Sequence, residues 1–281
     1  MKTITLNNNV EMPILGFGTF ELNDYDVCKG AVLTALQSGY RLLDTAVVYG
    51  SDNAVGDAIR ESGVPREEIF INSKVWVTHM GYEKTKEWLD LSLQRLGVDY
   101  LDMLLIHNPQ GDVHGSWRAM EEMYEAGKVR SIGLSNFYPD RVTDIMLYNK
   151  IKPALVQLET HVFYQRNEEH AFLQEHGIAH EAWAPLVQGE KGIFMNKVLT
   201  GIGEKYHKTA AQVALRWNIQ RDVIVIPRAD NPVFIKENIN VFDFELSTED
   251  MALISKLDEK KTTFFDSRDP KIIEILFQIQ G

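Results

Sequence analysis

The sequence is poor in cysteine, because its 281 residues contain only Cys28. A single cysteine cannot form an intrachain disulfide, and a protein without disulfides suits the reducing cytosol, so we expect a cytoplasmic location. There is no cysteine cluster, and the eight histidines show no spacing typical of a metal site. We therefore predict no bound metal.

Long hydrophobic runs are also missing. No run of about 18 apolar residues occurs that would span a bilayer, and residues 1–7 lack the apolar region of a secretory signal. Basic residues are outnumbered, since 29 Lys and Arg against 40 Asp and Glu give a net charge of −11. This balance disfavours nucleic acid and anionic membranes as partners, whereas a small anionic ligand needs only a local basic group.

Signatures of several common enzyme classes are absent. The sequence has no Gly-x-Ser-x-Gly nucleophile elbow and no phosphate-binding P-loop. Gly16 and Gly18 are followed by Phe20-Glu21, which leaves the dinucleotide fingerprint of a Rossmann domain incomplete. No internal repeat, low-complexity tract or linker rich in Pro, Gly or Ser divides the chain, so we expect one domain over residues 1–281.

What the sequence does show is a regular alternation of strands and helices. Eight strand–helix units in about 230 residues predict an α/β fold, a (β/α)8 TIM barrel, with an N-terminal β-hairpin at 2–13 and a C-terminal extra helix and tail from Ser247 on. The predicted strands are 14–19, 41–44, 69–74, 101–106, 129–134, 154–158, 178–183 and 223–226. The predicted helices are 24–38, 53–62, 82–96, 115–126, 139–149, 167–175, 207–220 and one that follows Asn231-Pro232.

Four polar residues stand out because each lies at or just past the end of a predicted strand. Asp44 and Tyr49 follow the apolar residues 41–43. Lys74 ends the next strand, and His107 ends the one after it. The C-terminal ends of the strands form the active-site face of a parallel barrel, so we expect these four side chains to converge there.

Together the four side chains have the properties of a proton donor for a carbonyl group. Tyrosine is a poor acid at neutral pH, and we expect the ammonium of Lys74 to lower the pKa of Tyr49. Asp44 would hold Lys74 in place and keep it charged, and His107 would orient the carbonyl oxygen. Because no side chain delivers hydride, these residues imply a cofactor.

The chain resembles the aldo-keto reductases over essentially its whole length. The resemblance is carried by residues 15–20 with 43–50, by residues 117–137, and by residues 225–227 with Glu237-Asn238. Within that family it is similar to small bacterial reductases of 2,5-diketogluconate-type keto sugars or methylglyoxal. The resemblance implies a monomeric oxidoreductase that uses NADPH to reduce a small-molecule carbonyl substrate. The catalytic residues that it implies are Tyr49, Lys74, Asp44 and His107.

The resemblance also implies that the cofactor lies extended across the barrel mouth. Ser135, Asn136 and Gln157 would bond the carboxamide of the nicotinamide, and Trp183 would stack on its ring, where relatives commonly have tyrosine. From the residues alone, polar groups satisfied by the backbone and a plain core tryptophan stay open as alternatives. The other cofactor contacts that the resemblance implies are Gly18, Thr19, Asp44, Pro185, Leu186, Ile226, Arg228, Glu237 and Asn238.

The adenosine end departs from the family pattern. Arg228 stands where many relatives have lysine, and an arginine holds a phosphate in bidentate fashion. Ala229 replaces a serine, and Phe234 replaces an arginine that helps to hold the 2′-phosphate. We expect NADPH, with Lys236 either assisting Arg228 or lying on the helix surface, and NADH use is the alternative.

At the substrate end, we expect contacts from the cleft wall and from the C-terminal tail. The expected substrate contacts are Phe20, Trp76, His107 and Asn108. Packing is an equal alternative for the first two, and Asn108, where relatives often have tryptophan or glutamine, suits a small or hydroxylated carbonyl compound. The stretch 262–268 looks mobile, and the tail that contains it is expected to fold over the mouth as a lid.

Two other functions stay open. A Schiff-base aldolase would use Lys74, but that reaction needs a lysine of depressed pKa, and a facing Asp44 would keep the lysine charged. A nicotinamide-binding regulatory protein with little turnover is the second alternative, although all four catalytic residues are present.

Overall fold

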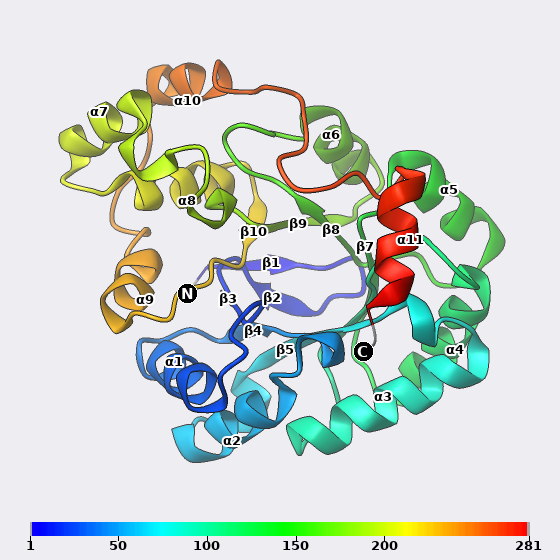
Figure 1. Ribbon diagram of the computed structural model, residues 1–281. Helices are drawn as coiled ribbons and strands as arrows, with labels where there is room; N and C mark the ends of the chain where they lie inside the picture. Colours follow the sequence, from blue (N-terminus) through cyan, green and yellow to red (C-terminus); the bar gives the residue numbers. More distant parts are fainter. Residues whose placement is uncertain (1, 280–281) are drawn as a thin grey trace.

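The structure is a computed structural model that describes residues 2–279. Within these residues, eight parallel strands pair in chain order from β3 to β10. The sheet closes on itself, since Leu15 bridges Val225 and the Gly16 N–H donates to the Val225 carbonyl at 2.8 Å. The predicted (β/α)8 barrel is confirmed (Figure 1). The strands are β3 (Phe17–Gly18), β4 (Leu42–Asp44), β5 (Phe70–Val75), β6 (Met103–Ile106), β7 (Ile132–Ser135), β8 (Leu155–Glu159), β9 (Ala179–Trp183) and β10 (Val223–Val225).

Helices surround the barrel, and each helix between strands covers its outer face (Figure 1). All residues of β6 and β10 are buried, because parallel barrel strands face side chains on the inside and helices on the outside. The helices of this ring are α1 (Tyr25–Gln37), α2 (Asp52–Ser62), α3 (Tyr82–Leu96), α4 (Val113–Glu125), α5 (Pro139–Tyr148), α6 (Asn167–Glu175), α7 (Lys197–Tyr206), α8 (Ala210–Gln220) and α9 (Pro232–Ile239).

Local signals set where the helices begin. The Asp24 carboxylate accepts from the Val27 N–H at 2.9 Å and caps α1. Thr209 and Gln212 form a capping box at the start of α8. Proline begins α5 and α9, where its missing N–H costs no hydrogen bond. These starts fix the lengths of the loops that leave the strand ends.

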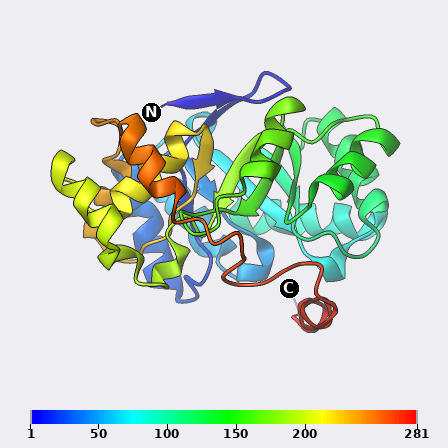
Figure 2. The ribbon, with the colours of Figure 1, turned by 90° about the horizontal axis from the view of Figure 1, so that it is seen from above.

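The hairpin of β1 (Thr3–Thr5) and β2 (Glu11–Pro13) closes one end of the barrel. Asn7 Nδ2 donates to the Pro153 carbonyl and Asn8 Nδ2 to the Arg130 carbonyl, at 2.8 and 2.9 Å. Both carbonyls precede their strands, so the hairpin covers the N-terminal ends. Figure 2 shows the hairpin and the C-terminal helix α11 (Pro270–Gln278) on opposite ends of the barrel. The C-terminal ends of the strands therefore lie on the side of α11.

The helix predicted at 207–220 is present as α8, but it begins at Ala210. A separate helix, α7, which was not predicted, precedes it from Lys197 to Tyr206. Helix α7 was missed because Gly201 and Gly203 weaken its helical pattern. Gly203 has a packing reason, since a side-chain carbon there would collide with the Lys208 carbonyl.

The tail also differs from its prediction. The predicted extra helix is present as α10 (Thr248–Ser255), which begins with a capping box of Ser247 and Asp250, but α11 was not predicted. The stretch 262–268, which looks mobile in sequence, is tied to the barrel. The Thr263 N–H and the Thr262 hydroxyl both donate to the buried Glu159 carboxylate. Contacts with a residue so far away in sequence leave no local pattern.

Candidate active site

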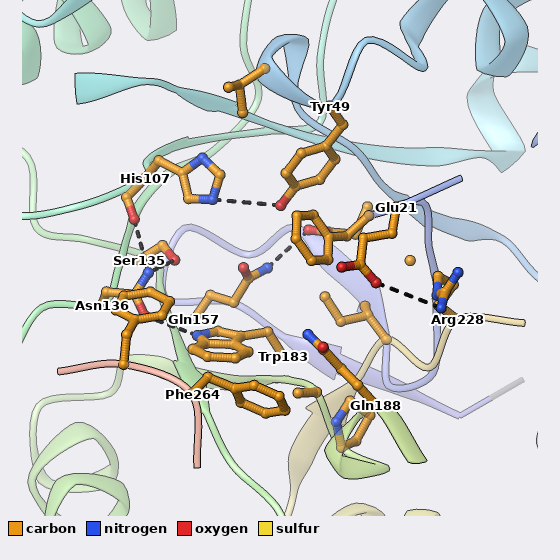
Figure 3. Close-up of a pocket in the computed structure, with 18 of the residues that line it drawn as sticks. Glu21, Tyr49, His107, Ser135, Asn136, Gln157, Trp183, Gln188, Arg228 and Phe264 are labelled. Atoms are coloured by element: carbon orange, nitrogen blue, oxygen red, sulfur yellow. Dashed lines mark hydrogen bonds and ion pairs between the residues drawn. The ribbon is translucent and has the colours of Figure 1, made fainter. Parts of the chain in front are cut away.

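A cleft of about 670 Å³ opens at the C-terminal end of the barrel, a volume typical of small-molecule sites. Strand ends and the loops that follow them form its walls (Figure 3). Most of the residues singled out in the sequence converge here. Those that line the cleft are Gly18, Phe20, Asp44, Tyr49, Trp76, His107, Asn108, Ser135, Asn136, Gln157, Trp183, Pro185, Leu186, Ile226 and Arg228.

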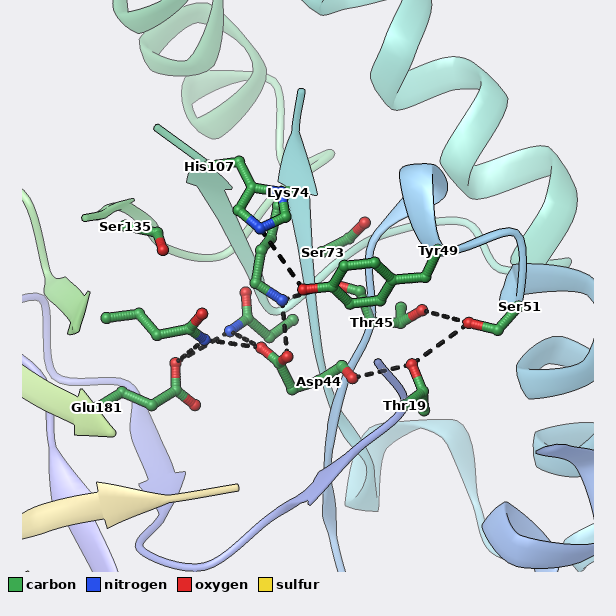
Figure 4. A network of polar contacts seen from close by, with 12 residues as sticks. Thr19, Asp44, Thr45, Tyr49, Ser51, Ser73, Lys74, His107, Ser135 and Glu181 are labelled. Atoms are coloured by element: carbon green, nitrogen blue, oxygen red, sulfur yellow. Dashed lines mark hydrogen bonds and ion pairs between the residues drawn. The ribbon is translucent and has the colours of Figure 1, made fainter. Parts of the chain in front are cut away.

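Lys74 and Asp44 form a buried ion pair below the cleft. Lys74 Nζ donates to Asp44 Oδ1 at 2.6 Å and to the Thr45 carbonyl at 3.0 Å (Figure 4). Burial favours the neutral amine, but the Asp44 charge and Tyr49 outweigh it, so the pKa of Lys74 is raised above its ordinary value. Lys74 therefore stays charged. A lysine that forms a Schiff base has to be neutral to act as a nucleophile, so this environment disfavours the aldolase alternative.

Tyr49 ends the short turn η1 (Val47–Tyr49) above this pair. Its Oη lies 3.5 Å from His107 Nε2, and Lys74 Nζ lies 5.0 Å from the ring centroid. The sequence-based expectation that the pKa of Tyr49 is lowered is wrong. Burial raises the pKa of Tyr49 to about 12, and the opposing effect of Lys74 is smaller. The sequence shows the neighbouring charge but not the depth of burial.

His107 is a neutral imidazole at physiological pH. Burial and the nearby Lys74 charge hold its pKa well below the ordinary value. Within residues 2–279, no group hydrogen-bonds its buried Nδ1, whereas Nε2 faces Tyr49 Oη. In the tautomer that carries hydrogen on Nε2, the ring donates a hydrogen bond toward the cleft. Tyr49 and His107 thus offer two adjacent donors.

Two amides and a second carboxyl group surround Asp44 beneath the cleft. Asp44 Oδ2 accepts from Asn72 Nδ2 at 2.8 Å and from Gln157 Nε2 at 2.9 Å. Both amides also donate to Glu181 Oε2, at 3.2 and 2.8 Å (Figure 4). Burial and the Asp44 charge raise the pKa of Glu181 to about 8, so this carboxyl group is mostly protonated at neutral pH.

Asn136 and Trp183 form one wall of the cleft (Figure 3). Trp183 Nε1 donates to Asn136 Oδ1 at 2.9 Å, and Asn136 Nδ2 donates to the His107 carbonyl at 3.0 Å. Asn136 also has a left-handed backbone with φ of 63°, a conformation that asparagine tolerates better than most residues. The amide therefore ties the indole of Trp183 to the backbone of His107.

Gly18 and Thr19 occupy the tight contact between the first and last strands. A side-chain carbon on Gly18 would lie 2.9 Å from the Ile226 carbonyl oxygen, so only glycine fits. The Thr19 hydroxyl donates to the Asp44 carbonyl at 3.1 Å. Thr19 is buried and does not line the cleft, so it supports Asp44 from below.

At the expected adenosine end, Arg228 reaches the cleft, and its guanidinium lies 3.7 Å from the carboxylate of Glu21. Glu237 and Asn238 do not line the cleft. Asn238 is buried on α9, and Glu237 borders a separate hollow near Gln212. Their adenine contacts stay predictions.

Aromatic side chains surround the Tyr49–His107 pair at the substrate end. The ring centroids of Phe20 and Tyr49 are 5.1 Å apart, and those of Trp76 and His107 are 4.9 Å apart. The Asn108 side chain is buried, and its Oδ1 accepts from Asn136 Nδ2 at 3.3 Å. Asn108 therefore supports the wall of the cleft as well as lining it.

The C-terminal tail reaches the cleft, as expected from the sequence. Phe265 stacks on Trp183 with centroids 5.5 Å apart, and Phe264 lies 5.6 Å from the same ring. Trp76 Nε1 donates to the Ile279 carbonyl at 2.9 Å. The tail thus adds apolar side chains to the mouth, and its closure over a ligand stays a prediction.

Sequence reasoning missed Glu181 and Asn72 as members of the site. A signal was available, because side chains two residues apart share one face of a strand. Glu181 shares a face with Trp183, and Asn72 shares one with Lys74. Glu21, Gln188 and Phe194 also line the cleft, but they lie in loops that no periodicity places.

Residues 2–279 lack two kinds of structural feature. No group of three or more His, Cys, Asp or Glu side chains is arranged to hold a metal ion. No helix in the same residues has the length and apolar character needed to cross a membrane.

Comparison with known proteins agrees with this geometry. The profile of the Aldo/keto reductase family matches residues 14–259. The 9,11-endoperoxide prostaglandin H2 reductase of Trypanosoma cruzi is 44% identical over 92% of this chain and 92% of its own length. The glyoxal reductase of Bacillus subtilis is 44% identical over 92% of this chain and 93% of its own.

Solved structures give the same result. The aldo-keto reductase MGS-M4 from a deep-sea metagenome library has a TM-score of 0.93 and 42% identity, and the match covers 95% of this chain and 98% of the other. An aldo-keto reductase of Bombyx mori, solved with NADP, has a TM-score of 0.90 and 31% identity over 97% and 96% of the two chains. The chain belongs to the aldo/keto reductase family and is an NAD(P)H-dependent oxidoreductase.

Proposed function

We propose that this protein uses NADPH to reduce a small aldehyde or ketone to the alcohol, with Tyr49 as the proton donor. The observation that carries the proposal is the pair of donors at the cleft, with Tyr49 Oη 3.5 Å from His107 Nε2 above a buried Lys74–Asp44 ion pair. A carbonyl oxygen placed between the two donors would be polarised by both.

The residues of the cleft fit a nicotinamide cofactor. Ser135, Asn136 and Gln157 line one region of it with polar groups suited to a carboxamide, and Trp183 offers a flat ring beside them. Arg228 provides a cation for phosphate at the mouth. When bound, the reduced nicotinamide supplies the hydride.

Tyr49 is suited to give a proton once the carbonyl oxygen gains negative charge. With its pKa raised to about 12, the free phenol is protonated at every physiological pH. The phenolate that remains after transfer lies close to the Lys74 ammonium, 5.0 Å from the ring centroid, and this charge stabilises it. Asp44 keeps the ammonium in place through the 2.6 Å contact.

The walls of the site favour small carbonyl compounds with little hydroxylation. Phe20, Trp76, Phe264 and Leu276 give the substrate end an apolar lining, and the Asn108 oxygen is already used by Asn136. Polyhydroxylated sugars would leave hydroxyl groups without partners against these surfaces. We therefore place methylglyoxal-type aldehydes ahead of keto sugars as substrates, a choice that the similarity to a glyoxal reductase supports.

The experiment compares oxidation of NADPH and NADH by the purified protein with methylglyoxal and a panel of keto sugars. We expect turnover with NADPH well above NADH. Tyr49→Phe should bind the cofactor as the wild type does and lose most of the reduction, because the ring remains and only the proton is removed. Full activity of Tyr49→Phe would contradict the mechanism, and tight cofactor binding without turnover in the wild type would favour a regulatory role.

A further inference from the structure

The most unusual buried group outside the catalytic four is Glu181, in the middle of β9. It is fully buried, and its Oε2 accepts from Gln157 Nε2 at 2.8 Å and from Asn72 Nδ2 at 3.2 Å. Its Oε1 is buried with no hydrogen-bond partner in residues 2–279. A carboxyl group that served packing alone would be expected to have both oxygens satisfied, so the arrangement calls for another role.

The contacts of Glu181 determine which way the Gln157 amide faces. Gln157 Nε2 lies between two carboxyl oxygens, Asp44 Oδ2 at 2.9 Å and Glu181 Oε2 at 2.8 Å. An amide nitrogen has two hydrogens, one for each acceptor, whereas an amide oxygen in that place would face two other oxygens. The nitrogen is therefore held in the barrel, and Gln157 Oε1, to which no residue of 2–279 donates, is left for the cleft that Gln157 lines.

We propose that Glu181 is a positioning residue that fixes the Gln157 amide, so that Gln157 presents a hydrogen-bond acceptor to the NH2 of the nicotinamide carboxamide. This inference rests on the proposed use of a nicotinamide cofactor. Through Gln157, Glu181 would thus make the nicotinamide end of the site selective for a cofactor with an amide N–H.

The surrounding charges are consistent with this role. The pair of carboxyl groups faces one buried cation, Lys74, and that cation contacts Asp44 and not Glu181. A protonated Glu181 leaves one positive and one negative charge in the barrel, and its Oε2 still accepts from both amides. The raised pKa of Glu181 agrees with that state. With the proton on Oε1, Oε2 remains an acceptor, and Asp44 Oδ2 accepts from Gln157 Nε2 in either protonation state of Glu181.

The test uses a cofactor analogue that lacks the relevant N–H. In 3-acetylpyridine adenine dinucleotide phosphate, a methyl group replaces the carboxamide NH2 and the rest of the molecule is unchanged. Binding of this analogue and of NADP to the protein would be followed by quenching of tryptophan fluorescence. The ratio of the two Kd values reports the contribution of the NH2 alone.

We expect Glu181→Leu to reduce the preference for NADP over the analogue by about fivefold, the range of one neutral hydrogen bond. Glu181→Gln should keep the preference, because its amide oxygen accepts from the same two groups. Glu121→Leu is the matched control: Glu121 is also a buried acceptor, of the Lys150 and Ile151 N–H groups, and lies away from the cleft. It should lose stability and keep the preference.

An unchanged preference in folded Glu181→Leu would overturn the inference. If that variant shows no cooperative thermal transition, Glu181→Met, which is flexible and apolar, takes its place with the same expected and contradicting results. Failure of the wild-type protein to bind either dinucleotide would instead contradict the proposed function, so the two failures are distinguishable.

Discussion

At the scale of single residues, burial decides the chemistry of the site as much as residue type does. Tyr49, Lys74 and His107 are ordinary titratable side chains whose pKa values all shift from their usual range in the structure. Burial is the largest influence on each, and the Lys74–Asp44 contact then determines which charges survive. As a result, Tyr49 is a neutral acid, His107 is a neutral hydrogen-bond donor and Lys74 is a permanent cation.

The Lys74 charge can be tested by Lys74→Met. The substitution leaves Asp44 buried without its cation, so we expect a loss of about 3–5 kcal/mol in the free energy of unfolding and a fall in kcat of about 100-fold or more. Lys86→Met is the control, because Lys86 pairs with Glu122 at 2.8 Å on the surface and should change stability by about 1 kcal/mol or less. Equal effects of the two substitutions in chemical denaturation would contradict the role of the buried pair.

Glu181 makes stability depend on pH in a defined direction. Its pKa is about 8 in the folded protein against an ordinary value of 4.5, so the folded state holds a proton that the unfolded chain loses between these values. Stability should therefore fall as the pH rises through this window. The side chain of Glu181→Gln does not ionise, so this variant should not lose that stability. Relative to the wild type, its free energy of unfolding should therefore increase from pH 5 to pH 8. A constant difference would argue against the raised pKa.

At the scale of secondary-structure elements, a few glycines allow elements to approach closely enough to form the barrel. Gly18 brings β3 against the residues that follow β10, and Gly133 lets β7 approach β8, since a side-chain carbon would lie 2.6 Å from the Leu155 carbonyl oxygen. Gly56 does the same for the contact of α2 with the end of α3. These positions set the spacing of the frame that holds the site.

Two helix glycines give a matched comparison of this effect. Gly56→Ala places a carbon in collision with the Leu96 backbone, so we expect a loss of about 1–3 kcal/mol. Gly30→Ala on α1 meets no atom within 4 Å and should gain about 0.5–1 kcal/mol from the higher helix propensity of alanine. Thermal unfolding of both variants measures the difference, and stabilisation by Gly56→Ala would mean that α2 and α3 pack less closely.

At the scale of the whole molecule, an acidic protein has to attract an anionic cofactor. The net charge is −11, which opposes the approach of a dinucleotide at long range. At the mouth of the cleft, Arg228 supplies a local positive charge, but Glu21 lies 3.7 Å from it and partly neutralises it. Glu21 follows β3 and Arg228 follows β10, the two strands at which the barrel closes. These two side chains therefore set the charge at the expected phosphate end of the cleft.

Glu21→Gln should release Arg228 for phosphate. We expect the Kd for NADPH to fall by about two- to fivefold and the Kd for NADH to change less, because NADH lacks the 2′-phosphate. Glu125→Gln, an exposed position on α4, makes the same change in net charge far from the cleft. If both variants improve NADPH binding equally in titration calorimetry, net charge and not the Arg228 contact is responsible.

The sequence by itself determined the barrel and the four catalytic candidates. Apolar strands alternating with helices allow few other folds, and Asp44, Tyr49, Lys74 and His107 are marked by their place at strand ends. Their convergence follows from the topology, since the same ends of parallel strands face the same way. The resemblance to the family likewise implied Ser135, Asn136, Gln157 and Trp183.

Only the tertiary structure decided the depth of burial and the long-range contacts. The raised pKa of Tyr49 depends on the side chains that cover it, and the position of the tail depends on Glu159, about a hundred residues earlier in the chain. The shared contacts of Glu181 arise where the paired strands β8 and β9 meet β5 across the barrel interior. Such contacts have no local signature, because they join residues that approach each other only once the barrel has closed.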